Sequence, residues 1–504
     1  MINFLSIESP FTSGFDDKGR IWVMTQHVQG GALSGNLSTL KVVAMVVAAA
    51  APLGAVLGMV PLTLFLGAGA STPVMYVFAG IILLLFSVGY AAISQHVSGA
   101  GGFYDYIARG LGRVPAAGAG LVAVVAYNAM TLALVSGVGY FASLNMHDMA
   151  GIDVPWWLFS FVSTAIIAVL GYRSAELAGS ILRILITLEL GILLVLVLAI
   201  IAQKGAAAFP LVSLDPTAIF TTGSVGLGLM FALSSFIGFE SAAIYAEETA
   251  DPQKSIPQAT YLTVIVVSLF FALVSWVTIG ALGVEKAADV ARDMQGGVYF
   301  MLSDMFVGKG LSVVLSLTVV TSLFASQLAL HNASSRYMYA IGREKLLPHW
   351  LGHAHQIRKT PSRASVVQTA ITVAAIIFYA GLGLDPYLQM TTSMIGLGTL
   401  GIFILQAAAS IAIVAYFWTR REPANPMVII GPAIAAVMLV LASALTIQNF
   451  KVLTGATSDW IYVVPFVLLA IALAGAAYAL WLRSKYPTVY AAIGTLSDIE
   501  ALPG

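Results

Sequence analysis

The chain has 504 residues, of which 59% are hydrophobic and only 9% are charged, whereas a soluble domain carries about 25% charged residues. This composition indicates a polytopic membrane protein. The 23 basic and 23 acidic residues cancel, so charge gives no sign of a nucleic-acid partner, and the absence of cysteine excludes disulfides, thiolate metal sites and cysteine nucleophiles.

The elements begin with a polar tail, residues 1–40, which lacks the short apolar core and cleavage site of a signal peptide. Apolar segments long enough to cross a bilayer follow, at about 20 residues per helical span. We predict an all-α membrane protein with 12 transmembrane helices, near residues 41–66, 72–96, 116–143, 155–171, 178–202, 223–248, 259–283, 310–341, 364–381, 388–417, 427–448 and 460–483.

Loop charges predict the orientation of these spans. An even number of spans puts both termini on one side, and most Lys and Arg residues fall in the loops of that side. The positive-inside rule then predicts cytoplasmic tails at residues 1–40 and 484–504, with the protein in the plasma (inner) membrane and in contact with its lipid. The opposite side keeps only Lys204, Lys286, Arg292, Lys309 and Lys451.

The first span carries a helix break between Pro52 and Pro61. Pro52 removes a backbone donor, and the two nearby glycines weaken the helix that follows. The second half-helix would expose N–H groups to a substrate carboxylate around Val56, Leu57 and Gly58. The predicted substrate-binding stretch is Gly54, Ala55, Val56, Leu57 and Gly58; a small-residue packing face formed by the two glycines is the alternative.

Polar residues inside the next spans have two interpretations. Tyr127 and Asn128 in span three could line a substrate cavity, although hydrogen bonding between helices is the commoner role. Glu189 in span five lies roughly 9 Å of helix beyond Arg183, so its carboxyl should be neutral unless it is paired. It is either a protonated structural group or a proton-coupling site.

The sixth span is interrupted at Gly238 and contains Glu240, a carboxyl that a bilayer does not tolerate without a reason. Carbonyls freed near Phe236 and Ile237 would suit a substrate ammonium, with Phe236 and Phe239 as walls or lids. We therefore predict that Phe236, Ile237, Gly238 and Phe239 bind substrate. Glu240 either couples proton movement to transport or caps the second half-helix by accepting backbone N–H bonds.

Spacing of the two breaks predicts an inverted repeat. The breaks lie in spans one and six, so the second set of five spans begins after five crossings of the membrane. Because five is an odd number, this second set must lie inverted relative to the first. The predicted units are the first repeat at 41–202, the inverted repeat at 223–417 and two further helices at 427–483.

Three stretches resemble the amino acid-polyamine-organocation permeases. These are residues 236–257, beginning Phe-Ile-Gly-Phe-Glu-Ser, residues 98–106 and residues 332–361. They occur in the family's order, and the likeness covers about residues 41–420. One departure is that the family's first break usually reads Gly-Ser-Gly or Gly-Ala-Gly, whereas Gly54 and Gly58 lie further apart here. The resemblance implies a secondary transporter, and several proton-coupled relatives place a lysine near the position of Glu189.

We predict from these observations a secondary active transporter of amino acids or related small amines, working by alternating access and proton-coupled symport. An exchanger of polyamines and amino acids, a sodium-coupled symporter and a transporter-like nutrient sensor are the alternatives. Neither a phosphate-cradling loop nor H-E-x-x-H is present, so we expect no enzyme, catalytic residue or cofactor. His349, His353 and His355 lie in a basic loop, which favours solvated side chains over a metal site.

Overall fold

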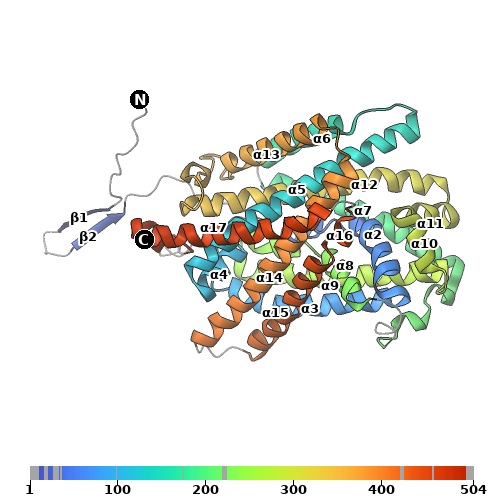
Figure 1. The fold of residues 1–504 in the computed structure, drawn as a ribbon, viewed down its shortest axis with the longest axis horizontal. Coiled ribbons are helices and arrows are strands. Elements are labelled where there is room, and N and C mark those ends of the chain that lie inside the picture. Colours follow the sequence, from blue (N-terminus) through green and yellow to red (C-terminus); the bar gives the residue numbers. More distant parts are fainter. Residues whose placement is uncertain are drawn as a thin grey trace.

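Long helices run side by side along the longest axis of the bundle in the computed structural model (Figure 1). The structure describes residues 11–15, 21–25, 33, 37–97, 99–173, 175–217, 224–420, 425–456 and 459–494. Parts of the predicted tails, together with Gly223 at the expected start of span six, lie outside these ranges.

The α-helices of the described ranges follow the predicted apolar segments, with short helices between them. They are α1 (Thr39–Ala49), α2 (Pro52–Leu62), α3 (Thr72–Ser94), α4 (Phe103–Leu111), α5 (Arg113–Ala150), α6 (Trp156–Tyr172), α7 (Ala175–Lys204), α8 (Val225–Ser234), α9 (Pro252–Leu282), α10 (Ala287–Met294), α11 (Val298–Phe306), α12 (Lys309–Arg343), α13 (Ser362–Gly381), α14 (Thr392–Arg420), α15 (Met427–Gln448), α16 (Phe450–Thr454), α17 (Val464–Lys485) and α18 (Pro487–Ala492).

The structure differs from the predicted elements in two places. The sixth span continues after its break as a 3-10 helix, η6 (Phe239–Glu248), rather than as an α-helix. The predicted amino-terminal tail contains a short antiparallel hairpin of β1 (Phe11–Phe15) and β2 (Ile21–Thr25), in which Phe11 is opposite Thr25.

Within the described ranges, 10 segments are long and apolar enough to cross a membrane. The first, Thr39–Ser94, has 56 residues and includes α1, α2 and α3, while Trp156–Tyr172 is a shorter apolar helix. The chain is therefore a multi-pass membrane protein.

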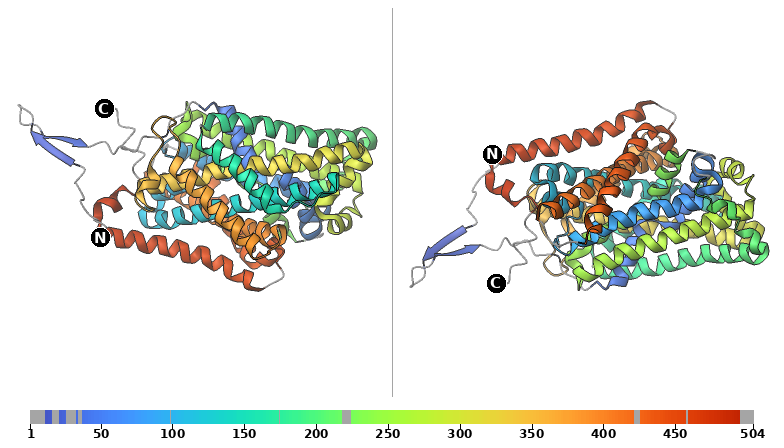
Figure 2. Two further views of the ribbon diagram at one scale, coloured as in Figure 1. Left: turned by 90° about the horizontal axis from the view of Figure 1, so that it is seen from above. Right: turned by 90° about the horizontal axis from the view of Figure 1, so that it is seen from below.

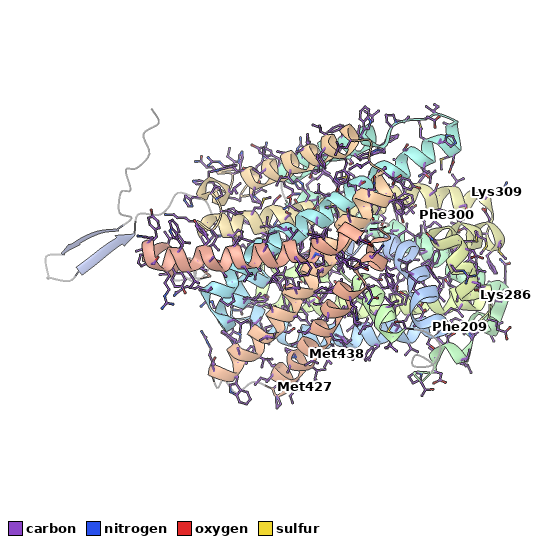
Figure 3. All side chains as sticks on the ribbon, viewed as in Figure 1. Phe209, Lys286, Phe300, Lys309, Met427 and Met438 are labelled. Carbon is purple, nitrogen blue, oxygen red and sulfur yellow. The ribbon has the colours of Figure 1, made fainter. Side chains whose placement is uncertain are left out.

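The two ends of the bundle differ in which parts of the chain they hold. The β1–β2 hairpin and the carboxyl end of α17 lie at one end, which we call the terminal end (Figure 1). Lys286 and Lys309 lie at the opposite end (Figure 3).

The interrupted helices are surrounded by the others. The first half-helix, α1, packs against α7, α9 and α12, and the long α5 packs against α12, α14 and α17. In both views of Figure 2, α17 runs along the outside of the bundle. This arrangement puts the ends of α1 and α8 in the interior, where freed backbone groups need partners from the protein itself.

Candidate functional site

The first helix break lies between α1 and α2, at Ala50 and Ala51. Ala51 has the left-handed conformation (φ 45°, ψ 64°), which turns the chain before Pro52 begins the next helix. Proline is suited to this first helical position because it has no N–H to leave unpaired. The first backbone donors of α2 are therefore those of Leu53 and Gly54.

Glu189 on α7 occupies the start of α2. Its Oε1 accepts a hydrogen bond from the backbone N–H of Leu53. The side chain is only 1% exposed, and its Oε2 forms no hydrogen bond with any described residue. Ser322 on α12 lies beside this carboxyl, but its hydroxyl also forms no hydrogen bond of normal geometry with a described residue. The positive end of α2 thus already holds a carboxyl group.

The second break contacts the first directly. α8 ends at Ser234, and the chain turns through residues 235–238 before η6 begins. Gly238 has φ 114°, which L side chains rarely adopt, and a Cβ there would lie 2.6 Å from the carbonyl carbon of Ala49. Glycine is required both for this backbone conformation and for the close approach of the two breaks.

Glu240 holds the start of η6. Its Oε2 accepts a hydrogen bond from the N–H of Gly238 at 3.0 Å, and its Oε1 accepts one from the Tyr127 hydroxyl at 2.9 Å. Gln406 on α14 donates to Oε2 at 3.5 Å, while Tyr90 donates to the backbone carbonyl of Glu240 at 2.6 Å. The capping geometry expected for a structural role is present, and it links α5 and α14 to the break.

The predicted aromatic walls are buried against different helices. Phe236 packs edge-on against Phe271 of α9, with ring centroids 5.5 Å apart. Phe239 packs edge-on against Phe86 of α3 at 5.8 Å. Ile237, between them, is 4% exposed. Contact of these three side chains with a substrate stays a prediction.

The predicted donors of the first span lie further along α2 than its start. Val56, Leu57 and Gly58 belong to its second turn, so the exposed donors come about one turn earlier than the sequence indicates, at Leu53 and Gly54. A Cβ at Gly54 would make ordinary contact with Leu323 at 3.5 Å, and one at Gly58 would have nothing within 4 Å.

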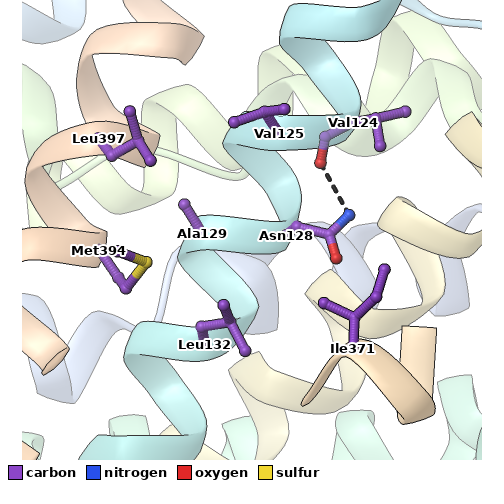
Figure 4. A pocket seen from close by; sticks show the side chains of 8 residues that line it. All are labelled: Val124, Val125, Asn128, Ala129, Leu132, Ile371, Met394 and Leu397. Atoms are coloured by element: carbon purple, nitrogen blue, oxygen red, sulfur yellow. Dashed lines mark hydrogen bonds between the residues drawn. The ribbon is translucent and has the colours of Figure 1, made fainter. Parts of the chain in front are cut away.

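Tyr127 and Asn128 face different surroundings although they are neighbours in sequence. Asn128 donates through Nδ2 to Val124 O at 2.8 Å and to Ser334 Oγ at 2.9 Å. It lies in a groove of about 300 Å³ between α5, α13 and α14, with apolar neighbours such as Leu132 and Ile371 (Figure 4). The structure therefore joins Tyr127, but not Asn128, to Glu240.

Two polar residues at the breaks were missed by sequence reasoning, Ser326 and Gln406. Ser326 on α12 donates to the carbonyl of Ala49, the last residue of α1, at 2.9 Å. Gln406 lies in the apolar run of α14, and a lone amide in such a run is the signal that could have identified it. His331, also on α12, is hydrogen-bonded to Ser365 at 2.9 Å.

Two ion pairs connect η6 to α12 at the terminal end. Arg336 contacts Glu248 at 2.5 Å, and both side chains are 2% exposed. Arg343 contacts Glu247 at 3.1 Å. Next to these pairs, Leu37 donates its N–H to the carbonyl of Glu248 at 3.0 Å.

Metal ions require clusters of side chains such as acidic residues and histidines. Among the described residues, no group of three His, Asp or Glu side chains could hold an ion. In the loop after α12, His353 is hydrogen-bonded to the His349 carbonyl at 3.2 Å.

Comparison with known proteins identifies similar transporters. The sequence model of a family described as amino acid permease matches residues 37–473. The low-affinity putrescine importer PlaP of Escherichia coli is 23% identical over 361 residues, which cover 69% of this chain and 74% of the relative. The branched-chain amino acid permease BcaP of Lactococcus lactis is 26% identical over 333 residues, covering 62% and 68%. The chloroplastic cationic amino acid transporter 6 of Arabidopsis thaliana is 27% identical over 380 residues; the match spans 72% of this chain but only 61% of that longer relative.

Proposed function

The chain belongs to the amino acid permease family, and we propose on that premise that it is a secondary active transporter of amino acids or related small amines across the cell membrane. The observation that carries the proposal is the contact between two interrupted helices. Gly238 of one break lies against Ala49 of the other, so a solute bound at either break would alter the packing of both. Interrupted helices meeting in this way are typical of transporters with alternating access.

A 12-helix topology accounts for the spans. Thr39–Ser94 has 56 residues, more than twice the roughly 20 needed for one crossing. If α1–α2 and α3 are separate crossings and α6 is counted, the 10 long segments become 12 spans. The breaks then fall in spans one and six, as expected for five-plus-five inverted repeats at 41–202 and 223–417, with 427–483 outside them. The positive-inside rule assigns both termini to the cytoplasmic side of the inner membrane.

We assign proton coupling to Glu240. Its carboxyl is buried and depends on hydrogen bonds from Gly238 and Tyr127, which favour the charged form against the cost of burial. Separation of the two breaks would move Gly238 and weaken one of these bonds. Opening of the site and protonation of Glu240 would then be linked. Glu189, the second carboxyl considered for this role, has a geometry that favours direct contact with substrate.

Accumulation in liposomes tests this assignment. With an inward proton gradient and no sodium, the wild type should concentrate a labelled substrate found in a panel of amino acids and amines. Glu240→Gln should retain exchange of labelled for unlabelled substrate but lose accumulation. Glu285→Gln, which changes an exposed carboxyl, serves as the matched control and should behave as the wild type. Accumulation that requires sodium and is normal in Glu240→Gln would contradict proton coupling.

A further inference from the structure

Both half-helix starts at the breaks already hold a carboxyl group of the protein. Glu189 reaches from α7 to the N–H of Leu53 at the start of α2. Glu240 reaches back to the N–H of Gly238 at the start of η6. The positive ends of half-helices are where an anionic group of a ligand would bind most readily, and here side chains occupy that place.

A substrate carboxylate at the start of α2 would meet Glu189. It would have to displace the Glu189 carboxyl from Leu53 or lie beside it, where it could not pair with Glu189 and would repel its ionised form. Glu189 forms no ion pair with a Lys or Arg among the described residues, and the hydrogen bond that it accepts comes from the uncharged N–H of Leu53. No cation of the described residues is therefore paired with Glu189 to offset the negative charge of a substrate carboxylate.

A cation would meet a suitable partner at the same place. The Oε2 atom of Glu189 is buried and accepts no hydrogen bond from the described residues, although a buried carboxylate oxygen normally has a donor. The Ser322 hydroxyl beside it also forms no hydrogen bond of normal geometry with a described residue. An ammonium group carries three donors and a positive charge, so it could satisfy both oxygens at once.

We propose that the transported substrate is an alkylamine without an α-carboxylate, bound through its ammonium group to Oε2 of Glu189 at the start of α2. This inference rests on the proposed transport function and narrows its substrate class. Because Gly238 lies against Ala49, the two breaks must separate to admit the amine. The alternative, in which Glu189 is only a protonated cap of α2, predicts no preference between amines and amino acids.

The test uses pairs of solutes that differ only in the carboxylate. Uptake of labelled putrescine is compared with that of ornithine, and uptake of isoamylamine with that of leucine, in liposomes containing the full chain. We expect saturable uptake of at least one amine, and no uptake or competition by its amino acid counterpart. Equal or better transport of the amino acids would overturn the inference while leaving the transport proposal intact. If no solute of the wider panel moves, both proposals fail.

Glu189→Gln supplies the second arm. Glutamine keeps an oxygen for Leu53 but loses the charge, so amine affinity should fall about 10- to 100-fold, as expected for one hydrogen bond to a charged group. Glu285→Gln should leave affinity unchanged. Thermal unfolding of Glu189→Gln checks that the variant is folded, and the solute comparison on the wild type stays decisive if it is not. Unchanged amine affinity in a folded Glu189→Gln variant would refute the proposed contact.

Discussion

The buried ion pair between Arg336 and Glu248 should be the most sensitive electrostatic contact at the terminal end. Arg336 Nε contacts Glu248 at 2.5 Å, its Nη1 donates to the Asn332 carbonyl at 2.9 Å, and its guanidinium lies 4.8 Å from the Tyr245 ring centroid. Replacing Arg336 by Met removes all three interactions and leaves the Glu248 carboxylate in the interior without its cation.

The expected cost follows from burial. Both side chains are 2% exposed, and breaking a buried pair by removing one partner costs about 3–5 kcal/mol of unfolding free energy. Replacing both partners by apolar residues removes the uncompensated charge, so the double variant Arg336→Met with Glu248→Leu should be more stable than Arg336→Met alone. An exposed pair gives the comparison: Arg292 and Asp289 are in contact at 2.9 Å with side chains 58% and 64% exposed, so Arg292→Met should leave the free energy of unfolding close to that of the wild type.

Unfolding of the purified protein in detergent measures these differences. The midpoint should fall sharply for Arg336→Met, recover in the double variant and stay near the wild type for Arg292→Met. If Arg336→Met were no more destabilising than Arg292→Met, or if the double variant were worse than the single one, the pair would not fasten η6 to α12 as described.

Three further substitutions test other contacts. Tyr127→Phe removes the O–H donor to Glu240, so the free energy of unfolding should fall by about 1–3 kcal/mol. The ratio of substrate inside to outside the liposomes should also fall. A ratio equal to that of the wild type would show that Tyr127 takes no part in proton coupling. Burial first, and then repulsion from Glu344, raises the pKa of Asp105 in α4 to about 7. The folded state therefore binds a proton more tightly than the unfolded chain, and stability from this group falls as pH rises towards about 7. Asp105→Asn should narrow the difference in melting temperature between about pH 5 and about pH 8, and an unchanged difference would argue against this titration. Gly494→Ala introduces a Cβ at φ 70° and 2.3 Å from the Cβ of Ala108. Proteolysis of the carboxyl-terminal segment should therefore accelerate. An unchanged rate of cleavage would mean that the contact between Gly494 and Ala108 does not stabilise this segment.

The positions of the breaks could be predicted from sequence because they depend on local backbone chemistry. Pro52 lacks an N–H, and Gly238 can adopt a positive φ that other residues avoid. The N–H groups at the start of α2 lie about one turn before the predicted Val56, Leu57 and Gly58, because the helix begins at Pro52 itself and continues through the glycines at 54 and 58. The polar composition of residues 1–40 does not predict the hairpin of β1 and β2.

The partners of the break residues could not be predicted, because they depend on tertiary packing. Leu53 and Glu189 are 136 residues apart in the chain, and no local pattern joins them. Tyr127 and Asn128 are adjacent, and successive residues of a helix point about 100° apart. Without the packing of α5, sequence alone cannot say which of them faces Glu240.

Counterflow in liposomes tests the central claim, that the two breaks form the site of a carrier, most directly. Liposomes containing the protein are loaded with unlabelled amines and amino acids and then diluted into a trace of labelled solute without any ion gradient. We predict a transient, saturable accumulation of label above its equilibrium level in the wild type, and its loss in a folded Gly238→Leu variant, whose side chain would collide with Ala49. A sensor would show no uptake, and a channel would equilibrate the label without overshoot; either result, or an unaltered overshoot in Gly238→Leu, would contradict the claim.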